Sequence, residues 1–399
     1  MRRLLALSVV SLLVAACSSA SDPASANGND ATHDAADDAA LDADDTRASA
    51  DVVVESALDV ADSIAPPDAP ADAPPDAAGT VVVPLTIITR NTGNGKGVTV
   101  PIAVGGAPAQ PFLVDTGSAG LRVMADSVST GAVTRTGTKL KEVYTDGTEL
   151  LGEEATALVA IGTASTSAPI HIQLIDTIDC VPSKPSCPAS SVGNDFFKKW
   201  GMVGIVGVGM GNSFASPSTF SPIAQLDDPY KSGFVVHLGA FGAPAGTATL
   251  TLGVRGLDAS VFHAVSLSAA SSPLPNGAPA WKDAAIDVCY ALDGTSITHE
   301  CAPSIFDTGA TATFWNSKSV PSSALSSGVL KPGSVFHATI ESGADKPFDM
   351  TLTVGSPATA SDDMVIVSSG FNTNLGLTPF FRFDIAFDLE KGAIAFKAL

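Results

Sequence analysis

The sequence predicts an all-β fold made of two related halves, on three observations. Short apolar runs rich in β-branched residues recur between Gly79 and Leu399, separated by Gly, Pro and Asn at the spacing typical of packed sheets. Apolar residues with helical periodicity are scarce in the same region. The tripeptide Asp-Thr-Gly occurs twice, at Asp115 and Asp307, with similar apolar residues before it. A region of about 320 residues is long enough for one large or two medium domains.

The first residues predict export. Arg2 and Arg3 precede an apolar run, Leu4–Ala16, which is too short to span a bilayer but has the size of a secretory signal. The run ends in Val-Ala-Ala before Cys17, which resembles the lipobox of bacterial lipoproteins, where the cysteine is acylated. Ser18 follows, and the absence of Asp there indicates the outer membrane in lipoproteins of Gram-negative bacteria. We therefore expect residues 1–17 to be a lipoprotein signal peptide and the protein to be lipid-anchored to the bacterial cell envelope. An ordinary cleaved signal with an incidental cysteine is the alternative.

Residues 18–80 are expected to form a disordered linker, because Ala, Asp, Ser and Pro dominate them and cannot build a core. Fifteen of the 41 acidic residues lie there but only one of the 21 basic ones, so the segment favours an extended tether. With the signal also set aside, 26 acidic and 18 basic residues remain for residues 81–399. This mildly acidic balance argues against nucleic acid as a partner. We expect a monomer that meets the membrane through its lipid anchor only.

Four cysteines remain after Cys17, and an even number in an exported chain predicts disulfides. Four cysteines allow three pairings. The local pairings, Cys180 with Cys187 and Cys289 with Cys301, are favoured because each closes a short loop. A metal site built on these cysteines is the weaker alternative, since neither spacing has the Cys-x-x-Cys form typical of zinc sites. We expect neither a metal nor another cofactor.

The same apolar runs predict individual strands and helices. The strand signals cover residues 81–88, 98–104, 158–161, 234–238 and 248–252. Short helices are expected at residues 196–200 and 222–226.

A repeated segment organises the chain. Residues 112–118 read Phe-Leu-Val-Asp-Thr-Gly-Ser, and residues 304–310 read Ser-Ile-Phe-Asp-Thr-Gly-Ala. A step ending in Gly follows each copy downstream, Ile-Val-Gly at 205–207 and Asn-Leu-Gly at 374–376. A single Asp-Thr-Gly suits an ordinary β-turn and arises by chance in a chain of this length with a probability of roughly a tenth. Two copies with matching flanks predict a distant duplication.

Burial of the Asp side chain in this motif would change how it ionises. An apolar strand that runs into Asp-Thr-Gly buries the Asp at the end of a sheet, and Gly permits a tight turn that a Cβ would obstruct. The Thr hydroxyl can hydrogen-bond across to a partner loop. Two facing loops bring Asp115 and Asp307 so close that both cannot ionise, and the pair shares a proton. The ionised carboxylate then acts as general base on a water while the protonated carboxyl polarises a substrate carbonyl.

The chain resembles the pepsin family of aspartic peptidases over nearly the whole region from residue 79 to 399. Residues 115–123 read Asp-Thr-Gly-Ser-Ala-Gly-Leu-Arg-Val, similar to the family's Asp-Thr-Gly-Ser-Ser-Asn-Leu-Trp-Val. Residues 144–148 are similar to the family's flap hairpin, 204–209 to its Gly-Ile-Leu-Gly-Leu-Gly step, and 375–396 to its last strands. The resemblance implies a bilobal pepsin-like aspartic peptidase fold, with the cleft between two related β lobes at residues 81–240 and 241–399.

The resemblance also implies roles for single residues. Asp115 and Asp307 correspond to the catalytic dyad. Thr116 and Thr308 correspond to the residues that brace the two loops, and Ser118 to a donor for the outer oxygen of Asp115. The remaining supporting positions of the two loops are Gly117, Gly309 and Ala310.

Two positions depart from the family's pattern. Ala310 stands where cellular pepsins usually have Ser or Thr, so Asp307 is expected to lack one hydrogen bond to its outer oxygen, as in retroviral aspartic peptidases, which also read Asp-Thr-Gly-Ala. Arg122 replaces the Trp that commonly supports the Tyr of the flap. That Tyr is Tyr144, in a hairpin with Gly147, and it is expected to close over a peptide or protein substrate. An aromatic residue on a surface hairpin is the alternative for Tyr144.

Rival catalytic motifs are missing from the sequence. It contains no Gly-x-Ser-x-Gly, and its six histidines show no His-Glu-x-x-His spacing. The sequence thus predicts an aspartic endopeptidase that hydrolyses peptide bonds with water activated by the Asp dyad. The wording Asp-Thr-Gly-Ser-x-Gly-Leu-Arg also resembles a family of uncharacterised exported bacterial proteins, and a non-catalytic surface binding protein on the same scaffold is the alternative.

Overall fold

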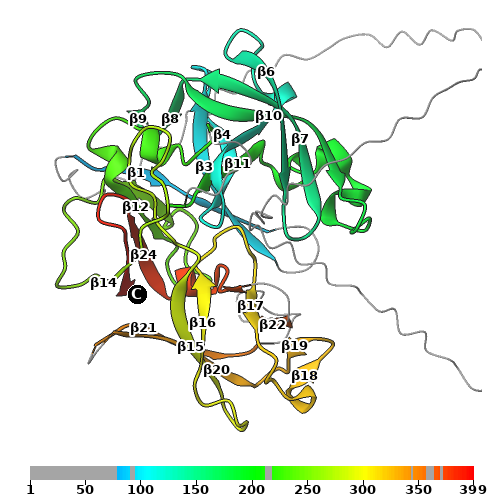
Figure 1. The fold of residues 1–399 in the computed structure, drawn as a ribbon, viewed down its shortest axis with the longest axis vertical. Helices are drawn as coiled ribbons and strands as arrows, with labels where there is room; N and C mark the ends of the chain where they lie inside the picture. Colours follow the sequence, from blue (N-terminus) through cyan, green and yellow to red (C-terminus); the bar gives the residue numbers. More distant parts are fainter. Residues whose placement is uncertain (1–78, 90–94, 212–217, 343–344, 356–363, 369–371) are drawn as a thin grey trace, which may run out of the picture. The chain divides into compact units, whose positions relative to one another are not determined.

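The computed structural model describes residues 79–89, 95–211, 218–342, 345–355, 364–368 and 372–399. These residues fold mostly into strands, which confirms the predicted all-β class (Figure 1). The expected signal peptide, Cys17 and the linker up to residue 78 lie outside the described residues. Within the described part, no helix is long and apolar enough to cross a membrane.

The first half of the chain builds a ten-stranded sheet in the order β6-β7-β10-β5-β11-β4-β3-β8-β9, with β2 beside β3. Its strands are β2 (Thr86–Thr89), β3 (Lys96–Val104), β4 (Gln110–Asp115), β5 (Ala119–Met124), β6 (Thr134–Val143), β7 (Thr148–Ala157), β8 (Val159–Ile161), β9 (Ala164–Ser165), β10 (Ile170–Cys180) and β11 (Gly204–Val208). The central strands β5 and β11 are buried along their whole length, as strands covered on both faces are expected to be.

The second half builds a nine-stranded sheet in the order β18-β19-β22-β17-β23-β16-β15-β20-β21. Its strands are β15 (Ile286–Leu292), β16 (Glu300–Ile305), β17 (Thr313–Asn316), β18 (Leu325–Ser326), β19 (Val329–Leu330), β20 (Val335–Ser342), β21 (Asp345–Thr353), β22 (Val365–Ser368) and β23 (Thr373–Asn374).

A third, six-stranded sheet joins the start, the middle and the end of the described part of the chain in the order β1-β13-β12-β24-β25-β14. Its strands are β1 (Val81–Pro84), β12 (Gly233–His237), β13 (Thr249–Leu252), β14 (His263–Ser266), β24 (Phe383–Asp388) and β25 (Ala393–Ala398). The lobe boundary expected near residue 240 falls between β12 and β13, which are neighbours in this sheet.

One expectation about a single strand was wrong. The strand expected at residues 81–88 is two strands in different sheets, because the chain leaves β1 after Pro84 and β2 pairs with β3 instead. The short helices expected at 196–200 and 222–226 are confirmed, each as a single 3-10 turn within its range. The 3-10 turns are η1 (Ala125–Ser127), η2 (Pro188–Ser191), η3 (Gly193–Asp195), η4 (Lys198–Trp200), η5 (Ile223–Gln225), η6 (Tyr230–Ser232), η7 (Ser322–Ala324) and η8 (Thr378–Phe381).

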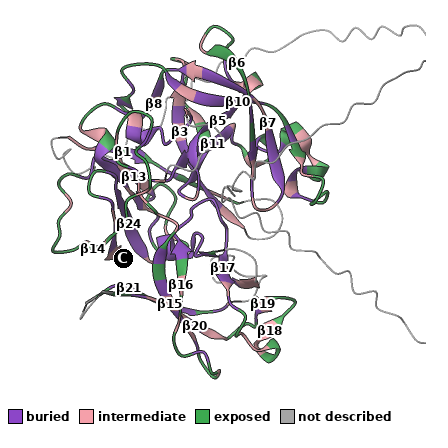
Figure 2. Ribbon diagram, in the orientation of Figure 1, coloured by how far each residue is buried: buried purple, intermediate pink, exposed green. Residues whose placement is uncertain are grey.

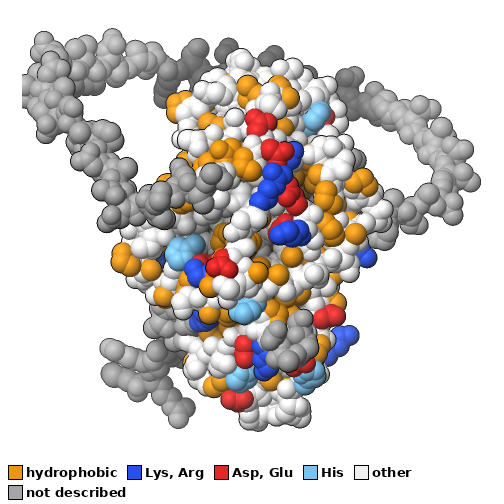
Figure 3. All heavy atoms as spheres, turned by 90° about the vertical axis from the view of Figure 1, so that its left-hand side faces the viewer, with side chains coloured by type: hydrophobic (Ala, Val, Ile, Leu, Met, Phe, Trp, Pro, Cys, Tyr) orange, Lys and Arg blue, Asp and Glu red, His pale blue; other side chains and the backbone are white. Residues whose placement is uncertain are grey.

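Buried apolar residues line the strands of all three sheets (Figure 2). A smaller apolar cluster lies under β7 and β10 and includes Leu113, Tyr144, Leu150 and Phe197. Charged side chains of both signs are interspersed on the face shown in Figure 3. That face therefore has no large basic patch, in keeping with the mildly acidic balance of this region.

The two sheets repeat one arrangement around the Asp-Thr-Gly motifs. In the first, β4 pairs in parallel with β11, and Leu113 lies opposite Ile205. In the second, β16 pairs in parallel with β23, and Ile305 lies opposite Asn374. Leu113 and Ile305 each precede their Asp by two residues. Asp115 thus stands at the buried end of β4 and Asp307 two residues beyond the buried end of β16, and each of these strands has a parallel neighbour.

Candidate active site

Hydrogen bonds interlock the two Asp-Thr-Gly loops. The Thr116 hydroxyl donates to the Phe306 carbonyl at 2.7 Å and accepts from the Thr308 N–H at 3.0 Å. In return, the Thr308 hydroxyl donates to the Val114 carbonyl at 2.7 Å and accepts from the Thr116 N–H at 3.1 Å. Both threonines are buried. The four bonds are reciprocal, so each loop fixes the position of the other.

This brace brings the two carboxyl groups together. Asp115 and Asp307 are fully buried, and their carboxyl groups lie close enough to influence each other's ionisation. A Cβ added to Gly117 would lie 2.5 Å from the Cγ of Asp307, so the carboxyl group packs directly against the backbone of the opposite loop. Only glycine leaves room for this approach.

Burial and mutual repulsion perturb both carboxyl groups. Burial raises the pKa of Asp115. Burial, followed by the negative charge of Asp115, raises the pKa of Asp307 well above its usual range. Two carboxyl groups buried side by side cannot readily both ionise, so the pair retains one proton. The arrangement holds one potential base and one potential acid side by side.

Backbone and side-chain donors hold the individual oxygens. The Gly117 N–H donates to Oδ1 of Asp115 at 2.9 Å, and the Gly309 N–H donates to Oδ1 of Asp307 at 2.7 Å. The Ser118 hydroxyl donates to Oδ2 of Asp115 at 2.6 Å, as the resemblance implies.

The expectation that Asp307 lacks a donor to its second oxygen was wrong. The side chain of Asn374 donates through Nδ2 to Oδ2 of Asp307 at 2.5 Å. Ala310 is fully buried and offers only a methyl group. The parallel pairing of β23 with β16 brings Asn374 alongside the strand that leads to Asp307, and the donor therefore comes from another strand. Sequence reasoning noted Asn374 only as part of a Gly-ending step.

Arg122 lies in a buried ion pair instead of on the surface. Its Nη2 lies 3.0 Å from Oε2 of Glu142, and both side chains are about as buried as the core, at 4% exposure. The guanidinium also donates to the carbonyls of Ala119 and Gly120 and lies 6.0 Å from the ring centroid of Tyr144. Its positive charge partly offsets the rise in the pKa of Asp115 that burial causes. A charged pair thus occupies the position beneath Tyr144 where the pepsin pattern has Trp.

Tyr144 stands at the turn between β6 and β7, and its ring is buried in the smaller apolar cluster. Gly147 completes the turn with φ of 93°, and its N–H donates to the Tyr144 carbonyl. The turn is tied to the loop that follows β10, because the Val181 N–H donates to the Gly147 carbonyl and the Lys184 ammonium binds the Thr145 carbonyl. The hairpin expected to be a flap is therefore held at its turn by a neighbouring loop.

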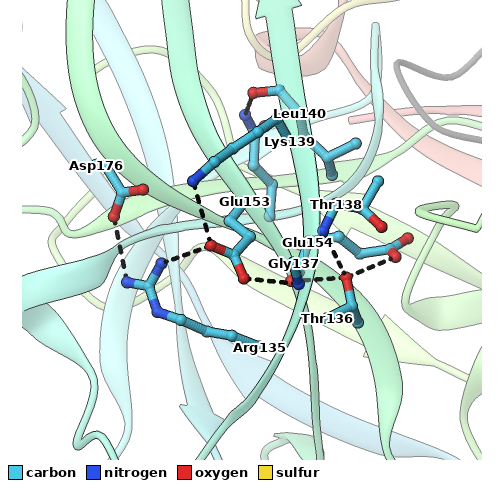
Figure 4. A network of polar contacts seen from close by, with 10 residues as sticks. Arg135, Thr136, Gly137, Thr138, Lys139, Leu140, Glu153, Glu154 and Asp176 are labelled. Carbon is cyan, nitrogen blue, oxygen red and sulfur yellow. Dashed lines mark hydrogen bonds and ion pairs between the residues drawn. The ribbon is translucent and has the colours of Figure 1, made fainter.

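The opposite end of the same hairpin carries an ionic network (Figure 4). Glu153 on β7 binds Arg135 and Lys139 of β6 and accepts a hydrogen bond from the Gly137 N–H, while Arg135 also reaches Asp176 on β10. The register of β6 against β7 shifts between Arg135 and Lys139. The network bridges this irregularity and links β6 to β10. Because Arg135 and Lys139 are largely exposed, it adds little to stability.

The structure contains the two disulfides favoured by the spacing. Cys180 is bonded to Cys187 in the loop that holds the hairpin turn. Cys289 is bonded to Cys301, its direct cross-strand neighbour on β15 and β16. Among the described residues, the grouping of possible metal ligands is Cys289, His299 and Cys301. Two of the three sulfur or nitrogen ligands in it are consumed by the disulfide, so this grouping carries no metal site as it stands.

The threonine brace gives a first prediction. Thr116→Val should lower the free energy of unfolding by about 2–3 kcal/mol, because the Phe306 carbonyl and the Thr308 N–H both lose a buried partner. Denaturant titration measures this change. Thr116→Ser is the matched control because it keeps the hydroxyl. Equal stability of the Val and Ser variants would show that the hydrogen bonds do not hold the loops.

Comparisons with known proteins agree with this geometry. The family model of the PE-PGRS C-terminal aspartyl peptidase-like domain matches residues 81–394. The crystal structure of an aspartic proteinase from Irpex lacteus superposes with a TM-score of 0.51 at 19% sequence identity, covering 80% of this chain and 97% of that one. At this identity the similarity shows the fold alone, which is bilobal and pepsin-like. No curated protein matches the chain. Since the family model covers most of the chain, including both Asp-Thr-Gly loops, the protein belongs to the PE-PGRS C-terminal aspartyl peptidase-like domain family.

Proposed function

We propose that the protein is an aspartic endopeptidase that hydrolyses peptide bonds with water activated by Asp115 and Asp307. One observation carries the proposal, namely the reciprocal threonine brace that holds the two loops, and with them the two buried carboxyl groups, against each other. A protein that only binds ligands has no need for two buried carboxyls, whose burial is unfavourable in the ionised form.

The carboxyl pair supplies a base and an acid from the same site. The ionised carboxylate takes a proton from a water, whose oxygen attacks the carbonyl carbon of the substrate. The protonated carboxyl donates toward the carbonyl oxygen as negative charge develops there. The proton taken from the water is then passed to the leaving nitrogen as the C–N bond breaks. The pair again holds one proton.

The pKa shifts set the expected pH range. The pair is competent while it holds one proton. Because the pKa of Asp307 lies well above its usual range, that state persists to a higher pH than ordinary carboxyls would allow. Activity is therefore expected at acidic pH and is lost as the pH rises through the raised pKa.

We also propose that the protein works outside the cytoplasm, anchored by a lipid on Cys17 and held off the membrane by the linker at residues 18–80. The signal-like run and the lipobox-like residues before Cys17 support this location. The two disulfides support an oxidising compartment.

A peptide-library digest tests the activity. The full-length protein is incubated with the library from pH 3 to pH 8, and products are identified by mass spectrometry. We expect internal cleavages that are strongest at acidic pH and that decrease with pepstatin, which mimics the tetrahedral state. The Asp307→Asn protein is the matched control. Absence of any cleavage that depends on Asp307 would favour the alternative of a binding protein on this scaffold.

A further inference from the structure

The second oxygen of each Asp receives its hydrogen bond from a different place in the two halves. Oδ2 of Asp115 is bound by Ser118, three residues later in the same loop. Ala310 occupies the matching position after Asp307, and its side chain has no donor. There the donor is Asn374, a buried residue on β23.

Strand register shows that the polar donor lies in the loop in the first half and on the neighbouring strand in the second half. Leu113 faces Ile205 in the first sheet, and Ile305 faces Asn374 in the second. Asn374 therefore occupies the place of Ile205. The first half combines a hydroxyl in the loop with an apolar side chain on the neighbouring strand, whereas the second half combines a methyl in the loop with an amide on that strand.

The orientation of the Asn374 amide is fixed. Its Oδ1 accepts the Gly376 N–H at 2.8 Å, so Nδ2 must face Asp307. An amide nitrogen only donates, whereas a hydroxyl can donate or accept. Oδ2 of Asp307 therefore accepts a hydrogen bond from a group that can only donate. A proton of Asp307 cannot point from Oδ2 toward Asn374. Together with the Gly309 N–H on Oδ1, this gives each oxygen of Asp307 one donor.

We propose that Asn374 is a positioning residue of the carboxyl pair, which replaces from a neighbouring strand the loop hydroxyl that is absent at Ala310. The proposal rests on the proposed peptidase function and deepens it. A donor to a carboxylate stabilises the ionised form, so Asn374 opposes the rise in the pKa of Asp307 and limits the pH up to which the pair keeps its shared proton.

The pH dependence of kcat/KM tests this role in the full-length protein. Asn374→Leu, which gives the second half the apolar side chain of the first, should move the alkaline limb upward by about one pH unit, since a hydrogen bond to the ionised form of Asp307 is lost. Ala310→Ser in the same chain should move the limb back, because it restores a hydroxyl at the position of Ser118. An unmoved limb in Asn374→Leu, or a shift that Ala310→Ser does not reverse, overturns the proposal.

Asn374→Asp separates the role from simple packing. This variant keeps an oxygen for the Gly376 N–H and almost the same shape, but it places a carboxyl oxygen against Asp307. The limb should move upward by more than in Asn374→Leu, and Asn374→Asp decides the question if the Leu variant does not fold. A limb at the wild-type position in Asn374→Asp would contradict a donor role.

A second measurement does not depend on activity. Losing the donor raises the pKa of Asp307 in the folded state further, so Asn374→Leu should lower the melting temperature more at pH 7 than at pH 4. This difference should vanish when Asp307→Asn is also present. If the wild-type protein cleaves no peptide, the proposed function fails, yet these melting curves still decide whether Asn374 acts on Asp307. A loss of stability that is equal at both pH values overturns the proposal.

Discussion

Replacement of either Asp115 or Asp307 by Asn is expected to lower kcat/KM for peptide cleavage by about a thousandfold or more, because the general base or the general acid is removed. Asn has nearly the same shape as Asp, so the fold should persist. The decisive comparison is between the two variants, since both carboxyls are needed in the same cycle. Full activity in either one would refute the assignment of the pair.

The same variants should lower activity but not stability, and their stability serves as the control for correct folding. The pKa values of both carboxyls are raised in the folded protein. Ionisation therefore opposes folding, and the wild-type protein should become more stable as the pH falls through these raised values. Asn cannot ionise, so Asp307→Asn should flatten the dependence of the melting temperature on pH above the usual range of a carboxyl group. A steeper dependence in this variant would contradict the direction of the shift.

The structure of the Asp-Thr-Gly loops could be predicted from the sequence because the residues that determine it lie within or next to the motif. The apolar residues before each Asp form a buried strand end, and Gly117 allows the close approach of Asp307. The threonine brace requires only that the two loops face each other, which the duplication already suggested. The geometry of these loops in the structure matches this reasoning at each backbone and hydroxyl contact.

The donor to Asp307 was not accessible in the same way. Asn374 is 67 residues from Asp307 in the sequence, and only the pairing of β23 with β16 brings the two together. A signal was nevertheless present. The step at 374–376 has a polar residue where 205–207 has an apolar one, and the loop at Ala310 lacks its hydroxyl. Two departures in the same half were compensating changes, which become visible only when strand register aligns the halves.

Arg122 was recognised as a departure, but its partner was not. Glu142 comes from β6, a strand whose other residues are mostly exposed, so its sequence pattern gave no reason to expect a buried carboxylate. The side-chain alternation of β6 near its end directs Glu142 inward, toward β5. The alternation of side chains along β6 does not identify which charged residue on another strand pairs with Glu142.

Breaking the Arg122–Glu142 pair should produce a large loss of stability outside the Asp-Thr-Gly loops. Arg122→Met removes the partner of a carboxylate that is 4% exposed and leaves it buried and uncompensated. The expected decrease in the free energy of unfolding is about 3–5 kcal/mol. Denaturant titration at pH 7 measures it. A decrease below about 1 kcal/mol, the range of exposed ion pairs, would show that the pair is hydrated in solution.

The double variant Arg122→Met/Glu142→Leu separates stability from the effect on the site. Replacing both charges with apolar groups removes the unpaired carboxylate, so most of the lost stability should return. The positive charge that partly offsets the rise in the pKa of Asp115 does not return. The acidic limb of kcat/KM should therefore stay above its wild-type position in a protein of nearly wild-type stability. If stability and the limb recover together, the buried pair only fills space beneath Tyr144, and Arg122 has no electrostatic influence on Asp115.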